Sequence, residues 1–260
     1  MKVFITGVSS FFASILKNSL ENTEIIPIKS KTNRDSDSMD FDKTFLNLID
    51  EDSYIIHAAW NMSNRKVANS KKINVEGTLD FFFSLDKKFH NQFIFVSSVG
   101  ASKYAQSTYG KHKQEVEEII LANKGMVLKC GLLIDENNPY EYGFFSNLYK
   151  LAKKAPIIPN FSGNKAIYQV TRINDIKKAF KEITTIKESK VYESFDQSSY
   201  SFKDLVQGLM NLDKKVVNFP WFIGYFVSKF FEIIKIDFAV KSDSLLGIRE
   251  MQKRFKHEKN

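Results

Sequence analysis

Tyr109 and Lys113 are the residues whose types and spacing most directly suggest chemistry. They are four positions apart in a segment with helical patterning, which places them on one face of a helix. A phenol has a reference pKa of about 10, too high for a base near neutral pH, and an adjacent ammonium lowers that value. The pair therefore indicates proton transfer at a substrate oxygen. The structural alternative is a surface tyrosine packed over a lysine stem.

Two serines precede this pair at the end of an apolar run. Phe93 to Val96 has the composition of a buried strand, and Ser97 and Ser98 follow at its carboxyl end. A hydroxyl at that place could hydrogen-bond a substrate oxygen that gains or loses a proton. Helix capping or turn formation, which serine performs routinely, is the alternative.

The N-terminal segment adds a glycine turn. A short apolar strand from Lys2 to Thr6 meets Gly7, and residues with helical spacing follow from Phe11 to Leu20. Backbone N–H groups and the positive end of a helix suit a pyrophosphate at such a turn. Ala13 is small enough for close packing of the helix on the strand, whereas Ser10 stands where a second glycine would let the phosphate approach most closely.

The remaining pattern alternates strands and helices. Further strands are expected at Glu24 to Ile28, Tyr54 to Ala59, Gln92 to Ser97 and Met126 to Ile134, with helices at Asn74 to Ser84 and Tyr109 to Ala122. In the first of these helices Phe81, Phe82 and Phe83 are expected to share a crowded face. The alternation predicts an α/β fold with a Rossmann-like doubly wound parallel sheet, which binds ligands at the carboxyl ends of its strands.

After residue 134 the alternation becomes irregular. A helix is expected at Tyr142 to Lys154, broken by Pro156 and Pro159, and then a strand, helix, strand and helix at 167–171, 175–183, 191–195 and 202–211. We expect a small mixed α/β C-terminal substrate-binding region. Residues 1–134 would form the dinucleotide-binding domain, with about 165–195 returning to it, and 135–260 would form mainly the substrate-binding region.

Phe219 to Phe238 is the most apolar tract. Its uncharged part, Val216 to Ser228, has 13 residues, whereas a spanning helix needs roughly 20, so integral membrane insertion is not expected. Lys229, Glu232 and Lys235 then recur at helical spacing, which favours a helix packed on the C-terminal region. Peripheral membrane contact is the alternative, through the aromatic residues Trp221, Phe222, Tyr225 and Phe226.

Composition excludes several classes of protein. The formal charge of +8 comes from scattered lysines with only 5 arginines and no nucleic-acid-binding motif, so no nucleic acid partner is expected. Cys130 is the single cysteine, which implies a reducing compartment and a cytoplasmic location without an intrachain disulfide. No metal site is expected, because the four histidines have no ligand spacing.

Together these motifs resemble the extended short-chain dehydrogenase/reductases of the NAD-dependent epimerase/dehydratase type. The resemblance covers most of the chain. Ile55 to Ala59 resembles the family's fourth strand, Asn74 to Thr78 its following helix, Val127 to Gly131 its Leu-Arg-Pro-Gly segment, and Ile173 to Ile176 its Val-Asp-Asp-Val segment. The chain departs from the family at Ser10 and Ala13, where glycines are usual, and in its short C-terminal half.

The resemblance implies a role for each matching residue. Tyr109 would be the general acid/base, Lys113 would lower its pKa and hold the nicotinamide ribose, and Ser98 would orient the substrate oxygen, with Ser97 as the alternative because only ten residues separate Ser98 from Tyr109. The cofactor-binding residues would be Gly7, Ser9, Ser10, Phe11, Phe12, Lys29, Ser30, Lys31, Asp40, Phe41, Ala58, Ala59, Trp60, Asn74 and Lys113. The short C-terminal half implies few substrate contacts, or completion of the site by the second subunit of a homodimer.

The choice of cofactor follows from the segment about 20 residues beyond the glycine turn, where NAD binders place an acid for the ribose. Ile28 to Lys31 contains none, and Lys29, Lys31 and Arg34 could pair with a 2′-phosphate. NADP(H) is therefore expected in preference to NAD(H). Solvent-facing lysines without a ligand are the alternative in this lysine-rich chain.

The three motifs support hydride transfer at carbon with proton transfer at oxygen. By the resemblance, the substrate would be a nucleotide-linked sugar. Dehydratases of the family usually carry an Asp-Glu pair after the hydroxyl, and Val99 and Gly100 stand there instead. We expect a ketoreductase. The alternative enzyme is a 4-epimerase that retains NAD. A non-catalytic NADP-binding sensor or scaffold is the alternative of a different class.

Overall fold

The computed structural model describes residues 1–20, 23–32, 38–62, 67–141, 143–162, 166–196, 198–233 and 242–247. The chain divides into two compact units. The first consists of residues 1–98, 112–130 and 172–195, and the second of 99–111, 131–171 and 196–260. Arg34 and Lys235 lie outside the described residues, as do parts of the expected helices at 142–154 and 219–238.

A six-stranded parallel sheet forms the centre of the first unit, in the order β2-β1-β3-β4-β5-β9. Its strands are β1 (Lys2–Thr6), β2 (Glu24–Pro27), β3 (Ser53–His57), β4 (Phe93–Ser98), β5 (Met126–Cys130) and β9 (Val191–Glu193). β2 lies on one side of β1 and β3 lies on the other, so the winding direction of the sheet reverses at β1. A doubly wound sheet binds ligands at the carboxyl ends of its strands at such a reversal.

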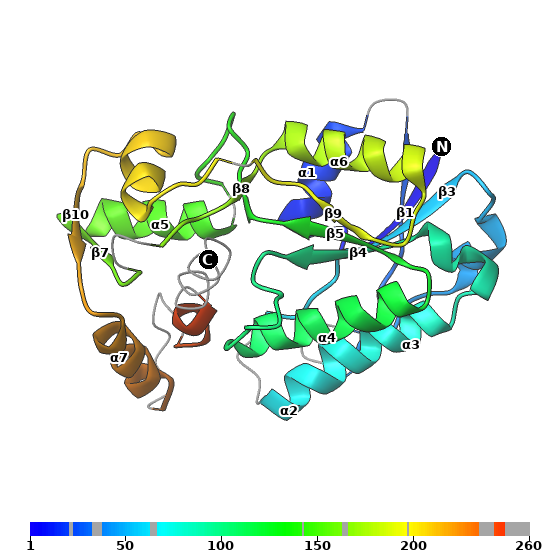
Figure 1. Ribbon diagram of the computed structural model, residues 1–260, viewed down its shortest axis with the longest axis horizontal. Coiled ribbons are helices and arrows are strands. Elements are labelled where there is room, and N and C mark those ends of the chain that lie inside the picture. Colours follow the sequence, from blue (N-terminus) through cyan, green and yellow to red (C-terminus); the bar gives the residue numbers. More distant parts are fainter. Residues whose placement is uncertain are drawn as a thin grey trace. The chain divides into compact units, whose positions relative to one another are not determined.

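Helices cover both faces of this sheet (Figure 1). α1 (Phe11–Ser19) and α6 (Ile173–Ile186) lie on one face, and α3 (Gly77–Phe83) and α4 (Thr108–Ala122) lie on the other. The short α2 (Val67–Ser70) leads into a π-helical segment, Lys71–Glu76, that runs into α3. The expected Rossmann-like α/β fold is confirmed.

The core beneath α3 and α4 is rich in phenylalanine. It includes Phe4, Phe41, Phe81, Phe82, Phe93 and Phe95, all buried. Phe83 is 52% exposed, because successive helical residues point about 100° apart, and it meets this core only at its edge, with its ring centre 5.2 Å from that of Phe82.

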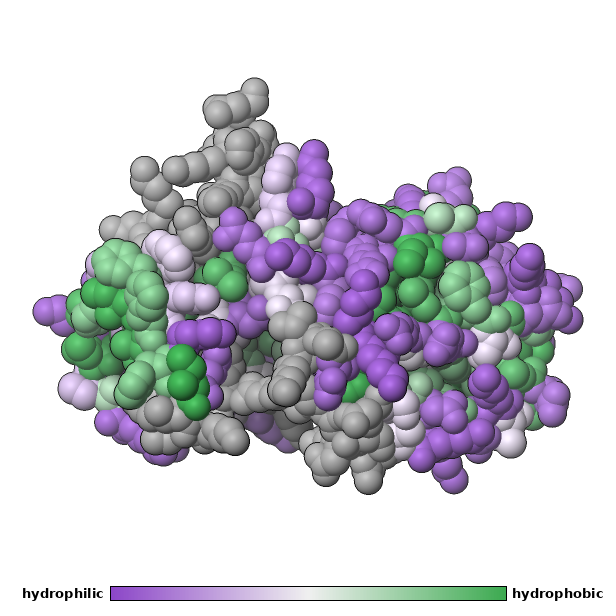
Figure 2. Space-filling view, turned by 90° about the horizontal axis from the view of Figure 1, so that it is seen from below, coloured by the Kyte–Doolittle hydropathy of each residue, from purple (hydrophilic) through white to green (hydrophobic). Residues whose placement is uncertain are grey.

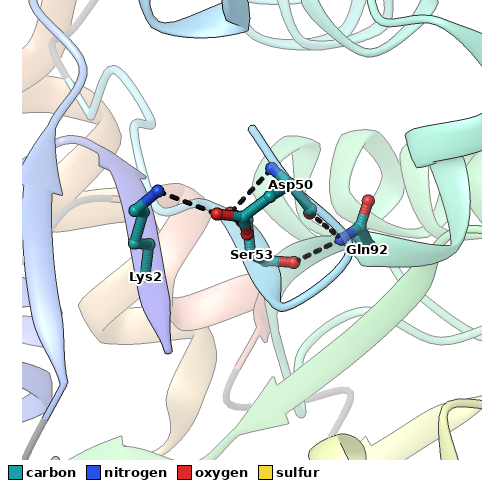
Figure 3. Close-up of polar contacts among 4 residues, drawn as sticks. All are labelled: Lys2, Asp50, Ser53 and Gln92. Carbon is teal, nitrogen blue, oxygen red and sulfur yellow. Dashed lines mark hydrogen bonds and ion pairs between the residues drawn. The ribbon is translucent and has the colours of Figure 1, made fainter. Parts of the chain in front are cut away.

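A hydrogen-bonded cluster fixes the amino ends of three strands (Figure 3). Asp50 accepts hydrogen bonds from Lys2 Nζ at 2.8 Å and from Ser53 Oγ at 2.5 Å. The Gln92 amide donates to the carbonyl oxygens of Asp50 and Ser53 at 2.7 and 2.8 Å. The cluster therefore ties β1, β3 and the start of β4 together at the end opposite to their carboxyl ends.

The strand expected at Met126 to Ile134 is interrupted. β5 ends at Cys130, and β6 (Leu132–Leu133) pairs instead with β8 (Val170–Thr171) in a separate sheet. Gly131 permits this change, because a Cβ there would lie 2.4 Å from the carbonyl oxygen of Gln169. The strand expected at 167–171 is shorter than predicted. Only β8 forms there, and Tyr168 makes an isolated bridge.

The second unit contains a parallel pair that the sequence did not reveal. β7 (Ile157–Asn160) pairs with β10 (Lys215–Asn218), although Pro156 and Pro159 had suggested a break. The unit also contains α5 (Gly143–Lys154), a π-helical segment (Asp204–Leu209), α7 (Trp221–Ile233) and a short helix at 242–247. Its own core includes Phe145, Ile158, Tyr168, Val170, Leu205 and Met210. None of the described helices is long and apolar enough to cross a membrane.

Candidate functional site

Gly7 forms a tight turn where the strand order reverses. Its φ of +67° lies in the left-handed region, and a Cβ would stand 2.7 Å from the backbone nitrogen of Ala59. Any side chain would therefore meet both backbone strain and the chain leaving β3. The turn brings Gly7 against residues 58–59, which the sequence had expected to contact the cofactor.

Ser10 is the N-cap of α1. Its Oγ accepts a hydrogen bond from the backbone N–H of Ala13 at 3.2 Å, and its own N–H donates to the Gly7 carbonyl at 2.8 Å. The residue that departs from the glycine pattern thus starts the helix. Ser9 is exposed and Phe11 is half-buried, whereas the Phe12 side chain lies in the core, so Phe12 could meet a cofactor only through its backbone.

A buried histidine joins the elements behind this turn. His57 contacts Thr6 Oγ1 through Nδ1 and Thr78 Oγ1 through Nε2, both at 3.0 Å. Burial, with a smaller contribution from the Lys113 charge, lowers the pKa of His57 to about 3. His57 is therefore neutral near pH 7 and connects β1, β3 and α3. The sequence predicted an apolar strand here but not these two hydrogen bonds of His57.

Trp60 and Lys113 form the most distinctive contact of the first unit. The Lys113 ammonium donates to the carbonyl oxygen of Val96 at 2.6 Å and lies 3.9 Å from the centre of the Trp60 ring. The ring of Phe95 is 4.4 Å away. Burial lowers the pKa of Lys113 to about 7, against smaller raising effects of Cys130 and Glu117. The ammonium is fixed at the carboxyl end of β4.

Asn74 holds the loop that carries Trp60. Its Oδ1 accepts from the backbone N–H of Asn61 at 2.7 Å, and its Nδ2 donates to the Asn61 carbonyl at 3.0 Å and to Ser70 Oγ at 3.3 Å. Both ends of the buried amide are thus engaged within the protein. Asn74 sits in the π-helical segment 71–76, an irregularity often found at functional sites. Asn74 shapes the loop that was expected to meet the cofactor.

The two serines of β4 are placed differently. Ser97 is buried and Ser98 is half-exposed. Ser97 pairs in register with Lys129 and Ser98 with Cys130. This alternation favours Ser98 as the hydroxyl that a substrate can reach.

A buried ion pair lies beneath Ser97. Lys129 Nζ is 3.0 Å from Glu117 Oε2. Burial raises the pKa of Glu117, while Lys129 and the hydroxyl of Ser97 oppose that rise. Neither Ser97 Oγ nor Glu117 Oε1 meets a hydrogen-bond partner of normal geometry among the described residues. Because Glu117 follows Lys113 by one helical turn in α4, its carboxylate favours the charged form of Lys113.

Tyr109 lies in the first turn of α4, one turn before Lys113. Its backbone N–H donates to Asp243 Oδ2 at 3.2 Å, and the N–H of Thr108 donates to Asp243 Oδ1 at 2.6 Å. Ser107 Oγ accepts from the N–H of Gly110 at 3.0 Å. Asp243 thus caps the helix that carries the expected acid/base residue. Sequence reasoning missed it, because no local pattern connects positions so far apart.

Lys29, Ser30 and Lys31 follow β2 in an extended segment. The N–H of Lys31 donates to the Asp40 carbonyl at 2.9 Å, and the N–H of Asp42 donates to the Lys29 carbonyl at 2.8 Å. Lys29 and Lys31 are exposed. The backbone N–H of Thr44 lowers the pKa of Asp42, and Lys31 and Lys29 add smaller lowering effects. An acid that the sequence reading missed therefore accompanies the two lysines.

Asp40 and Phe41, two of the cofactor-binding candidates, lie in no strand, and Phe41 forms only an isolated antiparallel bridge with Ser30. The Phe41 ring packs in the core, 5.6 Å from His57 and 4.9 Å from Phe81 between ring centres. Phe41 could approach a cofactor only through its backbone, whereas the Asp40 side chain is exposed. Within the described parts of the chain, no three His, Cys, Asp or Glu side chains gather as a metal site requires.

Comparisons with solved structures show what this arrangement resembles. The dTDP-4-dehydrorhamnose reductase of Bacillus anthracis in complex with NADP has a TM-score of 0.64 at 14% identity, covering 99% of each chain. The ADP-L-glycero-D-manno-heptose-6-epimerase of Helicobacter pylori has 0.61 at 16%, covering 84% of each. The dTDP-glucose 4,6-dehydratase of B. anthracis in complex with NAD has 0.59 at 13%, covering 100% of this chain and 97% of that one.

Sequence comparison gives a different and shorter match. No protein-family model matches the chain. The thiol:disulfide interchange protein DsbA of Buchnera aphidicola is 33% identical over an alignment of 103 residues that covers 36% of this chain and 47% of that protein. The chain thus spans less than half the length of this curated relative. An intramolecular disulfide requires two cysteines, and this chain has only the buried Cys130. What the geometry and the structural matches establish is that the chain has the fold of these dTDP-sugar and ADP-heptose enzymes.

Proposed function

We propose that the chain is an extended short-chain dehydrogenase/reductase that uses NADP(H) to reduce a keto group on a nucleotide-linked sugar. The observation that carries the proposal is the position of Lys113. Its ammonium is fixed on Val96 and Trp60 at the carboxyl end of β4, one helical turn after Tyr109. A lysine buried this deeply is costly, and a positive charge one helical turn from a tyrosine along α4 would serve proton transfer.

The residues around Gly7 fit a dinucleotide. The turn leaves no room for a Cβ, and it opens α1, whose positive N-terminal end favours a phosphate. Asn74 holds the loop with Trp60, and the exposed Lys29 and Lys31 would meet a 2′-phosphate. A bound nicotinamide would supply the hydride. The structurally similar reductase with NADP supports this choice of cofactor.

The protein's own residues would manage the proton. The Tyr109 hydroxyl would donate its proton to the carbonyl oxygen as the carbon is reduced, and the half-exposed Ser98 would hydrogen-bond the same oxygen. The Lys113 ammonium would stabilise the resulting phenolate. The glycine turn and Lys113 would thus serve one reaction, the conversion of a ketone to an alcohol.

The proposal is tested by incubating the purified protein with NADPH and a panel of nucleotide-linked keto sugars, following nucleotide absorbance and product mass. We expect consumption of NADPH with one keto sugar and a mass gain of two hydrogens. Tyr109→Phe should abolish turnover and retain NADPH binding. Two results would favour a non-catalytic sensor or scaffold. One is a wild-type protein that binds NADPH but turns over no sugar, and the other is a Tyr109→Phe variant with unchanged cellular function.

A 4-epimerase with retained NAD is the second candidate, and Asp42 is the observation that favours it. Its backbone N–H donates to the Lys29 carbonyl, which brings its carboxylate alongside the segment where NAD binders place an acid. An epimerase returns the hydride that it removes, so it consumes no cofactor. Release of NAD from the purified protein on denaturation, together with exchange between two sugar epimers, would establish this alternative.

A further inference from the structure

Helix α7 turns its large apolar side chains outward. Phe222, Phe226, Phe230 and Ile233 have 49, 66, 59 and 71% of their surface exposed. Ile223 and Val227 are exposed on the same side. A surface helix of a globular protein normally buries this stripe. Figure 2 shows the resulting hydrophobic cluster on the surface of the second unit.

Small residues form the opposite side of the helix. Gly224 and Ser228 are buried, and a Cβ on Gly224 would lie 2.7 Å from the Phe161 ring. The helix therefore rests on its glycine and serine side, and its orientation is set by close packing. A rotation that buried the phenylalanines would bring bulky side chains to a contact that admits only a glycine.

Polar and amphipathic residues border the apolar face. Trp221 and Tyr225 are half-buried with their ring centres 5.9 Å apart, and Lys229 is exposed. Glu232, the only acid in α7, accepts hydrogen bonds from both the N–H and the hydroxyl of Ser242 at 2.8 Å. Apolar side chains flanked by Trp, Tyr and Lys are typical of helices that lie in a membrane interface.

We propose that α7 binds the surface of an anionic lipid bilayer, lying parallel to it with Phe222, Phe226 and Phe230 among the acyl chains. Charge supplies the second attraction that stable anchoring requires. The chain carries +8, and the 27 residues after α7 contain seven Lys or Arg against four acids. Basic residues next to an interfacial helix are attracted to anionic headgroups.

A bilayer suits this face better than a second copy of the chain. Three half-exposed phenylalanines and three aliphatic side chains offer on the order of 500 Å². A stable interface buries about 800 Å² on each partner. The patch has the size of a functional surface on a monomer and falls short of a standard dimer interface.

The test is flotation of the full chain with vesicles, without nucleotide or sugar, so its result does not depend on the proposed enzyme activity. We expect binding to phosphatidylcholine vesicles that contain phosphatidylglycerol, weaker binding to phosphatidylcholine alone, and loss of binding as salt is raised. Phe226→Ser/Phe230→Ser should lower the partition coefficient at least about tenfold. Phe83→Ser is the matched control, since Phe83 is 52% exposed on α3 in the first unit.

Fluorescence of Trp221 gives a measurement that needs no substitution in α7. In a Trp60→Phe background Trp221 is the single tryptophan, and its emission should shift to the blue with anionic vesicles. Absence of both flotation and the shift would overturn the proposal, as would equal losses in the α7 and Phe83 variants. A lipid-free dimer that Phe226→Ser/Phe230→Ser dissociates would identify a second copy as the partner instead.

Discussion

The carboxylate of Asp243 accepts a hydrogen bond from the backbone N–H of Tyr109 at 3.2 Å, across 134 positions of sequence. Its other oxygen accepts from Thr108, so one side chain caps the start of α4. The short helix at 242–247 therefore fixes the turn on which the proposed acid/base residue stands. Gly247 also lies near Ser107, the second side chain that caps this turn.

Replacing Asp243 should disturb the reaction more than cofactor binding. Asp243→Ala removes a cap whose loss costs about 1 kcal/mol and frees the first turn of α4, so kcat should fall roughly tenfold. Asp243→Asn retains one acceptor and should fall between Ala and wild type. Kinetics and NADPH titration together measure this. A loss confined to NADPH affinity would contradict a role at Tyr109.

The buried ammonium of Lys113, which the proposed reaction requires, is predicted to destabilise the folded protein. With its pKa lowered to about 7, the folded protein holds fewer protons than the unfolded chain between pH 7 and about 10.4, so stability rises with pH across that window. Lys113→Met removes the buried charge. It should raise the free energy of unfolding by roughly 1 to 3 kcal/mol at pH 7 and abolish turnover.

Urea denaturation at several pH values measures the Lys113 prediction. The gain from Lys113→Met should be largest at and below pH 7 and should disappear as the pH approaches about 10.4. Lys111→Met is the matched control, since Lys111 is exposed on the same helix. A gain that does not change with pH would show that packing, and not the charge, is responsible.

Glu117 is predicted to support the charge on Lys113. Glu117→Gln removes the nearby carboxylate that raises the pKa of Lys113 and should therefore shift the alkaline limb of the kcat/KM profile towards lower pH. It also leaves Lys129 buried without its anion, at a cost of about 3 kcal/mol.

The double variant Glu117→Gln/Lys129→Met separates these two effects. Stability should recover, because no buried charge is left unpaired, while the shifted pH profile should remain. Recovery of both would show that Glu117 acts only through Lys129.

The sequence predicted much of the first unit, because strong local patterns coincide there with the final contacts. β1, α1, β3 and α4 each have a short apolar run or a helical period bounded by a glycine or a polar turn. The pairing of β7 with β10 could not be predicted, since the two strands are far apart in the chain and prolines mask the first. The outward face of α7 entered only as the alternative to packing on the C-terminal region, because composition cannot tell which side of an apolar helix is buried.

The site divides in the same way. Gly7, Ser98 and Lys113 could be proposed as site residues from residue type and from position on an element. Other contacts depend on distances between elements, which the spacing of residues in the sequence does not reveal. These are the hydrogen bonds of His57, of Asn74 with its loop and of Asp243 at the start of α4. Asp42 was missed because counting residues from the glycine turn led to Lys29. An antiparallel backbone contact brings Asp42 alongside that lysine.

Lys29 and Lys31 are predicted to discriminate between cofactors. Lys29→Ala/Lys31→Ala should weaken NADPH binding about tenfold or more and leave NADH binding nearly unchanged, because only NADPH carries the 2′-phosphate. Asp42→Asn should have the opposite effect on NADPH, since it removes a negative charge beside that phosphate. Calorimetric titration checks both, with the exposed Lys43→Ala as control. Equal losses for the two cofactors would refute the assignment.

Gly7 provides the most direct test of the dinucleotide turn. Gly7→Ala places a methyl group 2.7 Å from the Ala59 nitrogen at a φ of +67°, so it should cost about 1 to 3 kcal/mol of stability and abolish NADPH binding. Gly208→Ala is the control, because nothing lies within 4 Å of its Cβ position. That change should be neutral or stabilise the helix by up to about 1 kcal/mol. If Gly7→Ala kept its NADPH affinity, the cofactor would have to bind away from this turn, and the roles proposed for Ala59, Trp60 and Lys113 would fail with it.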